Sequence, residues 1–200
     1  ASKELSDKLK ECLKELDNSC VLLCLPETLT DLCKFEKRVQ KNWIINFADN
    51  YKYYKQYCSS RYTYGNAFVS RPYMAYKDKT KAGKNFTHLI SLFEDENIYI
   101  IEGALSRTGV GNNLFEKAKS ISRIICPSKN AYEYIERIKQ VSLEKVPKDA
   151  MVLLALGPTS KPLGLWLVHN GYWVIDIGHI DSEYEWYLKR AERKINIPFK

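Results

Sequence analysis

The stretch from Gly171 to Trp186, Gly-Tyr-Trp-Val-Ile-Asp-Ile-Gly-His-Ile-Asp-Ser-Glu-Tyr-Glu-Trp, joins a strand pattern directly to a cluster of charged side chains. Its first part, from Tyr172 to Ile175, is an unbroken apolar and aromatic run, which predicts a strand buried on both faces. Gly178 allows the sharp turn that a chain needs where it leaves the carboxyl end of a strand. Open α/β sheets bind their ligands at that edge, so the stretch predicts the fold class together with the position of the site.

Four ionisable side chains follow this strand within seven residues, namely His179, Asp181, Glu183 and Glu185. Carboxylate oxygens bind hard divalent cations, and imidazole joins them when the metal resembles Mn²⁺. The segment from Asp181 to Glu183 is also the only Asp-x-Glu in the chain. The alternative is a solvated acidic helix start, because Asp and Glu favour the first helical turn. The spacing alone leaves open whether His179, Asp181 and Glu183 form a metal site or such a helix start.

The second half of the chain alternates between strand patterns and helix patterns. Strands are expected over residues 97–102, 122–126 and 151–156. Helices are expected over residues 113–120, 128–138, 161–169 and 187–193. Such alternation is typical of βαβ units with right-handed crossovers, so it predicts an α/β fold with a mainly parallel sheet.

The first part of the chain predicts a helix over residues 2–16 and a short buried strand over residues 20–25. Residues 28–57 are expected to be helical, with Trp and Tyr rings that pack on the core or, alternatively, stack on a base or sugar. Pro72 biases Arg71 away from helix, so a strand entering a loop is expected there. No repeat or linker interrupts the chain, which predicts a single domain over residues 1–200.

The composition limits the possible partners and the compartment. The net charge of +7 calls for an anionic partner, such as nucleic acid, nucleotide phosphates or an anionic membrane. Acidic residues are mixed with the basic ones and no arginine-rich block occurs, so nucleic acid is not an expected partner. No apolar run approaches the ~20 residues that cross a bilayer. The six cysteines form no Cys-x-x-Cys pair and are interpreted as reduced, mostly buried thiols. We expect a cytoplasmic protein, with peripheral contact at the inner face of the membrane as a further option.

Two loops that follow expected strands are suited to anions. The first holds Arg107, Gly109, Gly111 and Asn112, where glycine lets the backbone approach an anion and a helix start would supply N–H groups. It matches neither the dinucleotide fingerprint nor the Walker loop, so a plain turn that needs glycine is the alternative.

The second loop runs from Gly157 to Lys161, where Thr159 and Lys161 can bind a diphosphate. A plain helix cap is the alternative for Thr159. Arg71 can add a forked contact to a phosphate. In a parallel sheet these loops and the acidic cluster meet at one edge, which is the layout of a metal–diphosphate site. The sequence therefore predicts glycosyl or nucleotidyl transfer from a nucleotide-sugar or a nucleotide.

Five motifs recur together in the order of one known family. They are Tyr64-Gly-Asn-Ala-Phe-Val-Ser-Arg-Pro-Tyr73, Glu102-Gly with Arg107-Thr-Gly-Val-Gly-Asn112, Arg123-Ile-Ile-Cys-Pro127 with Lys129-Asn-Ala131, Ala155-Leu-Gly-Pro-Thr159, and Asp176-Ile-Gly-His-Ile-Asp-Ser-Glu-Tyr-Glu-Trp186. Through them the chain resembles the GT-D-type glycosyltransferases, a bacterial family. The resemblance implies a Rossmann-like, mainly parallel sheet with helices on both faces, a UDP-sugar donor such as UDP-glucose, and Mn²⁺ or Mg²⁺ at an Asp-x-Glu motif. It also implies a glycan or glycoprotein acceptor, in surface polysaccharide biosynthesis or protein glycosylation.

The resemblance and the loops together suggest a role for each candidate residue. Asp181 and Glu183 match the metal motif, with His179 beside them. The candidates for binding the nucleotide-sugar are Arg71, Arg107, Gly109, Gly111, Asn112, Gly157, Thr159 and Lys161. Glu102 and Glu185 are the candidates for the general base, although Glu102 can instead bind a ribose hydroxyl.

One motif of the family is missing from the sequence. Family members carry an earlier Arg-Phe-Gly-Asp-Gly-Glu-like segment before a helix resembling residues 5–16, so we expect a fold that is truncated at the N-terminus or lacks this element. The first functional hypothesis is a metal-dependent glycosyltransferase. The alternative is a non-catalytic nucleotide-binding or assembly subunit on the same fold, which contacts a partner through residues 51–64. A nicotinamide-dependent oxidoreductase is disfavoured because the dinucleotide fingerprint is absent.

Overall fold

A computed structural model describes residues 2–16 and 18–197 of the chain. Its centre is a four-stranded sheet in the order β4-β3-β5-β6, in which all neighbours are parallel. The strands are β3 (Asn97–Gly103), β4 (Ser120–Cys126), β5 (Met151–Ala155) and β6 (Trp173–Asp176). The central strands β3 and β5 are almost entirely buried, as their continuous apolar runs require. The predicted α/β fold with a mainly parallel sheet is confirmed.

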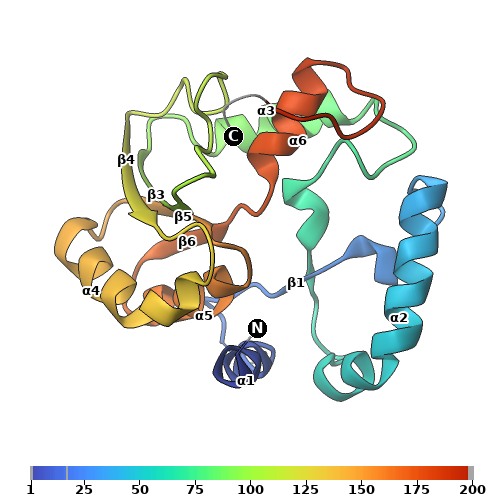
Figure 1. Ribbon diagram of the computed structural model, residues 1–200, viewed down its shortest axis with the longest axis horizontal. Helices are drawn as coiled ribbons and strands as arrows, with labels where there is room; N and C mark the ends of the chain where they lie inside the picture. Colours follow the sequence, from blue (N-terminus) through green and yellow to red (C-terminus); the bar gives the residue numbers. More distant parts are fainter. Residues whose placement is uncertain (1, 17, 198–200) are drawn as a thin grey trace.

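Helices cover both faces of the sheet and form a separate apolar cluster on each (Figure 1). On the face that carries Ile101 and Leu154, the cluster contains residues of α1 (Lys3–Cys12), α4 (Ile135–Lys145) and α5 (Ser160–His169). On the face that carries Ile100 and Leu153, it contains residues of α3 (Ala82–Ser91) and α6 (Ile180–Leu188). Successive strand residues point to opposite faces, which is why neighbouring positions belong to different clusters.

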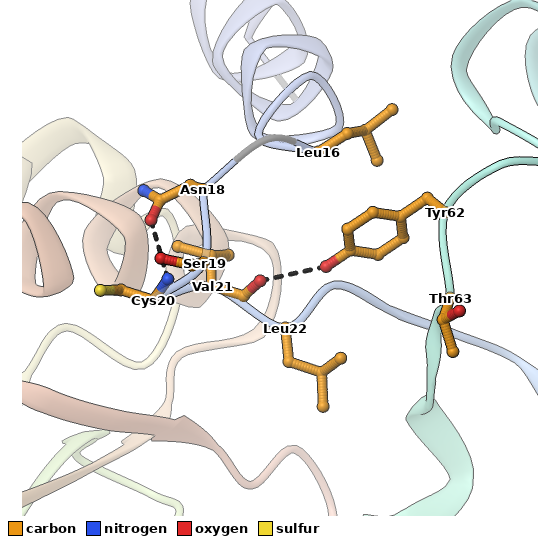
Figure 2. A pocket seen from close by; sticks show the side chains of 8 residues that line it. All are labelled: Leu16, Asn18, Ser19, Cys20, Val21, Leu22, Tyr62 and Thr63. Carbon is orange, nitrogen blue, oxygen red and sulfur yellow. Dashed lines mark hydrogen bonds between the residues drawn. The ribbon is translucent and has the colours of Figure 1, made fainter.

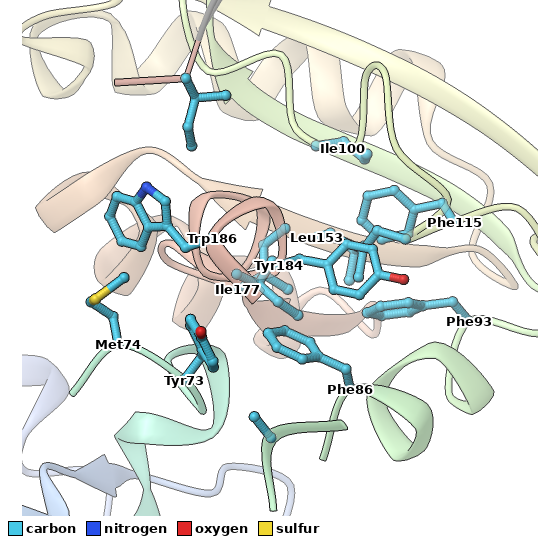
Figure 3. Packing of buried hydrophobic residues seen from close by; sticks show 14 of the residues in the cluster. Tyr73, Met74, Phe86, Phe93, Ile100, Phe115, Leu153, Ile177, Tyr184 and Trp186 are labelled. Carbon is cyan, nitrogen blue, oxygen red and sulfur yellow. The ribbon is translucent and has the colours of Figure 1, made fainter. Parts of the chain in front are cut away.

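The helix α6 is seated in the second of these clusters (Figure 3). The ring of Phe86 lies 4.9 Å from that of Tyr184 and 5.0 Å from that of Tyr187. Trp186 is buried, and its indole N–H donates to the carbonyl oxygen of Ile195 at 2.9 Å. These contacts fix α6 and therefore the positions of the acidic side chains that it carries.

Residues 21–66 form an arm beside the sheet. In this arm β1 (Cys24–Leu25) pairs in parallel with β2 (Gly65–Asn66), and α2 (Lys37–Tyr57) lies at the edge of the molecule (Figure 1). The fully buried ring of Phe35 packs at 4.9 Å on Phe68 and at 4.6 Å on Tyr76, which joins the arm to the chain that follows it. Short 3-10 helices cover Glu27–Leu29, Ala67–Ser70, Ala131–Tyr134 and Gly157–Thr159. The single domain over residues 1–200 stays a prediction.

Two predictions for the arm are wrong. The strand expected over residues 20–25 is limited to the two residues of β1, and Leu22 is 67% exposed, because β1 pairs with β2 outside the main sheet. The helix expected over residues 28–57 starts only at Lys37, since the chain before it is held by an antiparallel bridge between Phe35 and Tyr76. None of the residues of α2 is buried, so its aromatic rings are not part of the core.

Three predictions for the second half also need correction. Residues 113–119 form turns rather than a helix, because the N–H of Asp95 donates to Lys117 and the N–H of Lys119 donates to Glu96, beside the start of β3. The strand β6 is not buried on both faces, and Trp173 is 51% exposed, because β6 is an edge strand that pairs only with β5 among the described residues. The helix expected over residues 187–193 lies earlier, as α6.

The cysteines are free thiols, but they are not mostly buried. Only Cys12 and Cys126 are buried, and desolvation raises the pKa of each thiol to about 11. Cys20, Cys24 and Cys33 are exposed, because they lie outside the two apolar clusters that cover the sheet. Among the described residues, no helix is long and apolar enough to cross a membrane.

Candidate functional site

The carboxyl ends of all four parallel strands meet at one edge of the sheet. From β3 the chain passes to β4 on one side, and from β5 it passes to β6 on the other. The neighbours β3 and β5 therefore form a topological switch point, where open α/β sheets leave a crevice for ligands. The segments that follow β3, β5 and β6, each a loop with the helix after it where there is one, carry every candidate site residue except Arg71 and Glu102. Lys161 lies on α5, and Asp181, Glu183 and Glu185 lie on α6. Glu102 lies near the end of β3. The prediction that these loops share one edge is confirmed.

The loop after β3 is held in an unusual backbone conformation. Arg107, Gly109 and Gly111 all have positive φ, at 46°, 75° and 87°. Glu102, which is 1% exposed, accepts the N–H of Thr108 at 2.8 Å and pairs with the guanidinium of Arg123. Arg123 also donates to the carbonyl oxygen of Thr108 at 2.7 Å. A buried carboxylate and a guanidinium thus fix the start of this loop.

The loop after β5 leads directly into α5. Gly157 has a φ of 58°, and the hydroxyl of Ser160 accepts the N–H of Leu156 at 3.0 Å. Thr159 is buried and makes no side-chain cap, which disfavours the plain-cap alternative. The N-terminus of α5, with its partial positive charge, points to the carboxyl edge of the sheet. Lys161 lies in its first turn.

One salt bridge and one hydrogen bond bring further candidates to this edge. Lys161 Nζ lies 2.7 Å from a carboxylate oxygen of Asp176, the last residue of β6. Arg71 Nη2 donates to His179 Nδ1 at 2.8 Å. Arg71 therefore lies at the N-terminal end of α6, and Lys161 lies at the end of β6, the strand that precedes α6.

The acidic side chains of α6 anchor the loop after β3. Asp181 Oδ1 accepts the N–H of Gly109 at 2.8 Å and the side-chain amide of Asn112 at 2.9 Å. The same amide donates to Glu185 Oε1 at 2.8 Å, and Lys189 lies 3.4 Å from the other oxygen of Glu185. The structure thus brings together Asp181, Glu185, Gly109 and Asn112, which the sequence assigned to three different roles.

Glu183 anchors a different segment, the one that carries Arg71. Its Oε2 accepts the backbone N–H groups of Met74 at 2.8 Å and Tyr73 at 3.1 Å. Burial raises the pKa of the Glu183 carboxyl above its ordinary value, and these two N–H groups oppose the shift. The contact fixes the chain just after Arg71.

His179 occupies the N-cap position of α6, next to Arg71. Its pKa is lowered, first by desolvation of the ring and then by the positive charges of Arg71, Lys194 and Lys161, while Asp176 opposes the shift. The ring is therefore neutral at pH 7, as an Nδ1 that accepts a hydrogen bond requires. Because the pKa is lower in the folded state, stability falls as the pH drops from the ordinary value of about 6.5 toward the lowered one.

Replacing Arg71 with Gln is expected to raise the pKa of His179 part of the way back, because one positive neighbour is removed while desolvation remains. A titration of the histidine ring protons by NMR measures the shift. Arg137→Gln, at an exposed position on α4, is the matched control and should leave this pKa unchanged. An unaltered titration in the Arg71 variant would show that the contact with His179 does not persist in solution.

The acidic cluster does not fit a shared metal ion in this arrangement. Asp181 and Glu183 are two positions apart on α6, so they leave the helix in directions about 200° apart. Each is engaged by backbone donors, and the two segments that they hold are different ones. Among residues 2–16 and 18–197, no group of three or more His, Cys, Asp and Glu side chains could hold a metal. The metal role of Asp181, Glu183 and His179 stays a prediction.

The contacts of Arg123 with Glu102 and Thr108 were not predicted from the sequence, although Arg123 stands in one of the quoted motifs. The available signal was a charged residue in the middle of an expected parallel strand, directly before the apolar residues Ile124 and Ile125. Tyr73 and Met74 were missed as well, because they act through backbone N–H groups, which carry no signal in the side-chain sequence.

A separate hollow of about 430 Å³ lies between the end of α1 and the arm (Figure 2). Its lining includes Leu16, Asn18, Leu22 and Tyr62, and the Tyr62 hydroxyl donates to the carbonyl oxygen of Val21 at 3.0 Å. None of the candidate site residues lines it.

Known proteins match the chain along nearly its whole length. The chain is 42% identical over 197 residues to a protein of Streptococcus gordonii named probable glycosyl transferase Gly, covering 98% of this chain and 29% of that protein. It is 39% identical to the glycosyltransferase GlyD of Streptococcus pneumoniae serotype 4, covering 98% of this chain and 24% of that protein. The chain therefore spans less than a third of these curated relatives.

Solved structures agree with the sequence matches. A structure described as a new glycosyltransferase from Streptococcus sanguinis has a TM-score of 0.94 at 42% identity, over 98% of this chain and 73% of that one. A second, described as a highly conserved domain of unknown function with a distinct glycosyltransferase fold, has a TM-score of 0.94 at 37% identity, over 98% of this chain and 70% of that one. The family model for the glycosyltransferase GT-D fold matches residues 1–200. Because that match spans the whole chain, the protein belongs to the GT-D glycosyltransferase family.

Proposed function

We propose that this chain binds the diphosphate of a UDP-sugar and belongs to an enzyme that transfers the sugar to a surface glycan or glycoprotein. The proposed sugar is glucose, as the family resemblance implies. The observation that carries the proposal is the topological switch point between the carboxyl ends of β3 and β5. It is bordered by two loops with positive-φ glycines, the N-terminus of α5 and the cations Arg107 and Lys161. Family membership supports the same class of reaction.

The chemistry follows from the charge that develops during transfer. Breaking the bond between the sugar carbon and the diphosphate leaves negative charge on the phosphate oxygens, which positioned cations and a helix N-terminus stabilise. Lys161 and Arg107 would serve this purpose, with Arg71 as a forked donor from the side of α6. The N–H of Gly109 already donates to Asp181, so it would not bind the phosphate. Gly109 would contribute by letting the backbone of the loop come close to the diphosphate.

The two candidate bases are engaged by the chain itself. Glu102 is enclosed with Arg123 and Thr108, and Glu185 contacts Asn112 and Lys189. In this arrangement both carboxylates position the loop after β3. Their role as general base stays a prediction, as does the requirement for Mn²⁺ or Mg²⁺.

Calorimetric titration of this chain with UDP and UDP-glucose, with and without Mn²⁺, tests the proposal. We expect saturable binding, and Lys161→Ala should weaken it about tenfold, because a charged contact to phosphate is lost and Asp176 is left unpaired. Lys145→Ala, an exposed lysine at the end of α4, is the matched control and should bind as the unaltered chain does. A dependence on Mn²⁺ would support the predicted metal.

Two outcomes of this titration would contradict the proposal. If neither ligand binds while circular dichroism shows a folded protein, the donor-site proposal fails for this chain, and the non-catalytic assembly subunit becomes the better hypothesis. If the unaltered chain and the Lys161→Ala variant bind UDP with equal affinity, the chain has a nucleotide site, but that site does not include Lys161. This result would contradict the proposed position of the diphosphate.

A further inference from the structure

The helix α2 is exposed along its whole length. None of its 21 residues is buried, and the positions that are partly covered, such as Val39, Trp43 and Tyr54, lie on one side. On that side the ring of Trp43 lies 6.3 Å from Phe68. The opposite side faces away from the sheet at the edge of the molecule (Figure 1).

The charge of the protein is concentrated on this helix. It carries five basic residues, Lys37, Arg38, Lys41, Lys52 and Lys55, and a single acidic one, Asp49, which gives +4 of the net charge of +7. None of the five basic side chains forms an ion pair with a described residue, whereas Lys34, just before the helix, is paired with Glu27. The outward side of α2 is therefore a positive surface whose charge the described part of the chain does not neutralise.

Large apolar side chains lie next to these cations. Ile44, Phe47 and Tyr51 are 57%, 42% and 53% exposed, and they follow the spacing i, i+3, i+7 of one helix face. At about 100° per residue they fall within one arc of about 60°, and Lys41 and Lys55 fall in the adjoining arc. An apolar stripe bordered by lysines is the pattern of a helix that lies in the plane of a membrane surface.

We propose that α2 docks this protein on an anionic lipid surface. The stripe of Ile44, Phe47 and Tyr51 would enter the boundary between headgroups and acyl chains, and lysine side chains would extend along it to reach the phosphates. Charge complementarity selects this occupant, because a second copy of the same helix would bring two positive faces together. The lipid attraction acts through the charges, so it weakens with salt.

Sedimentation of this chain with lipid vesicles tests the proposal. Vesicles of phosphatidylcholine with added phosphatidylglycerol are expected to bind it, and vesicles of phosphatidylcholine alone are not. Binding should fall as the salt rises from about 0.05 M to about 0.5 M. Equal binding to both kinds of vesicle, or binding to neither, would overturn the proposal.

Matched variants test whether vesicle binding depends on the lysines of α2 or only on the net charge of the protein. The triple variant Lys41→Glu, Lys52→Glu and Lys55→Glu should lower the partition coefficient at least tenfold. The triple variant Lys84→Glu, Lys119→Glu and Lys145→Glu has the same net charge but changes exposed lysines outside α2. The logarithm of its partition coefficient should fall by less than half as much as in the α2 variant. Equal losses in the two variants would contradict a specific role of α2.

Insertion of the apolar stripe has its own readout. The chain already has four Trp residues, so the readout is the difference in emission between Phe47→Trp and the unaltered chain. This difference should shift to shorter wavelength when phosphatidylglycerol vesicles are added, and Tyr51→Ser should weaken binding without a change in charge. If instead the Lys→Glu variant of α2 loses affinity for a single-stranded DNA oligomer but keeps its affinity for vesicles, the partner is nucleic acid and the lipid proposal is wrong.

Discussion

Replacing Arg123 with Met is expected to lower the free energy of unfolding by about 2–4 kcal/mol, because it leaves the carboxylate of Glu102 buried without its cation. Glu102 is 1% exposed, so water cannot replace the guanidinium, and the bond from Arg123 to the carbonyl oxygen of Thr108 is lost as well. The side chain of Arg123 is 26% exposed, which places the expected cost below the upper end of the range for a fully buried pair. Urea unfolding followed by circular dichroism measures the change.

Two further variants show whether the pair itself is responsible. Arg123→Lys keeps the charge but not the forked donor, so it should lose less stability than Arg123→Met. Arg137→Met removes an exposed arginine from α4 and should change stability by no more than about 0.5 kcal/mol. If Arg123→Met is as stable as Arg137→Met, the pair with Glu102 does not stabilise the fold.

The other variant with a large expected effect is Gly109→Ala, which should cost about 2–5 kcal/mol of stability and weaken UDP binding. The φ of Gly109 is 75°, in the left-handed region that costs an L-residue roughly 1–2 kcal/mol. A Cβ atom there would lie 2.3 Å from the ring of Phe115, which is buried and packs at 4.9 Å on Phe93. Relieving that overlap moves a well-packed ring, at a further cost of about 1–3 kcal/mol.

Gly111→Ala is the control for this variant. Gly111 has a similar φ of 87°, but a Cβ atom there would meet nothing within 4 Å. Only the backbone strain then applies, so we expect a loss of about 1–2 kcal/mol. Thermal unfolding of the two variants compares them directly, and equal losses would show that Phe115 can move away without cost.

The elements that were predicted correctly are strands with apolar packing on both faces and a helix whose start is marked by turn residues. The strands β3 and β5 are covered on both faces, so their central residues are a continuous apolar run, Ile98 to Ile101 in β3 and Met151 to Ala155 in β5. The helix α5 was predicted within one residue of its start, because Gly157 and Pro158 mark the turn before it. The strand β6 has a similar apolar run but lies at an edge, and a sequence pattern does not tell an edge position from a central one.

The elements that were placed wrongly depend on their neighbours. Residues 113–119 have helix-forming side chains, but backbone bonds to residues 95 and 96 hold them in turns. The aromatic residues of α2 have the spacing of a core helix, yet the helix lies on the arm, away from the sheet. Local propensity is weak compared with such tertiary contacts.

The parallel α/β sheet and the loops that meet at its carboxyl edge could be predicted from the sequence, because apolar runs and glycine turns are local properties of the chain. The contacts of each acidic side chain at that edge depend instead on segments that are distant in the sequence. Asp181 holds Gly109 across 72 positions in the sequence, and Glu183 holds Tyr73 across 110. A carboxylate accepts hydrogen bonds from whichever donors the fold brings to it. Backbone N–H groups are the same at every residue except proline, so they leave no signal in the sequence. The pattern Asp-x-Glu therefore does not distinguish a carboxylate that holds a backbone segment from one that binds a metal.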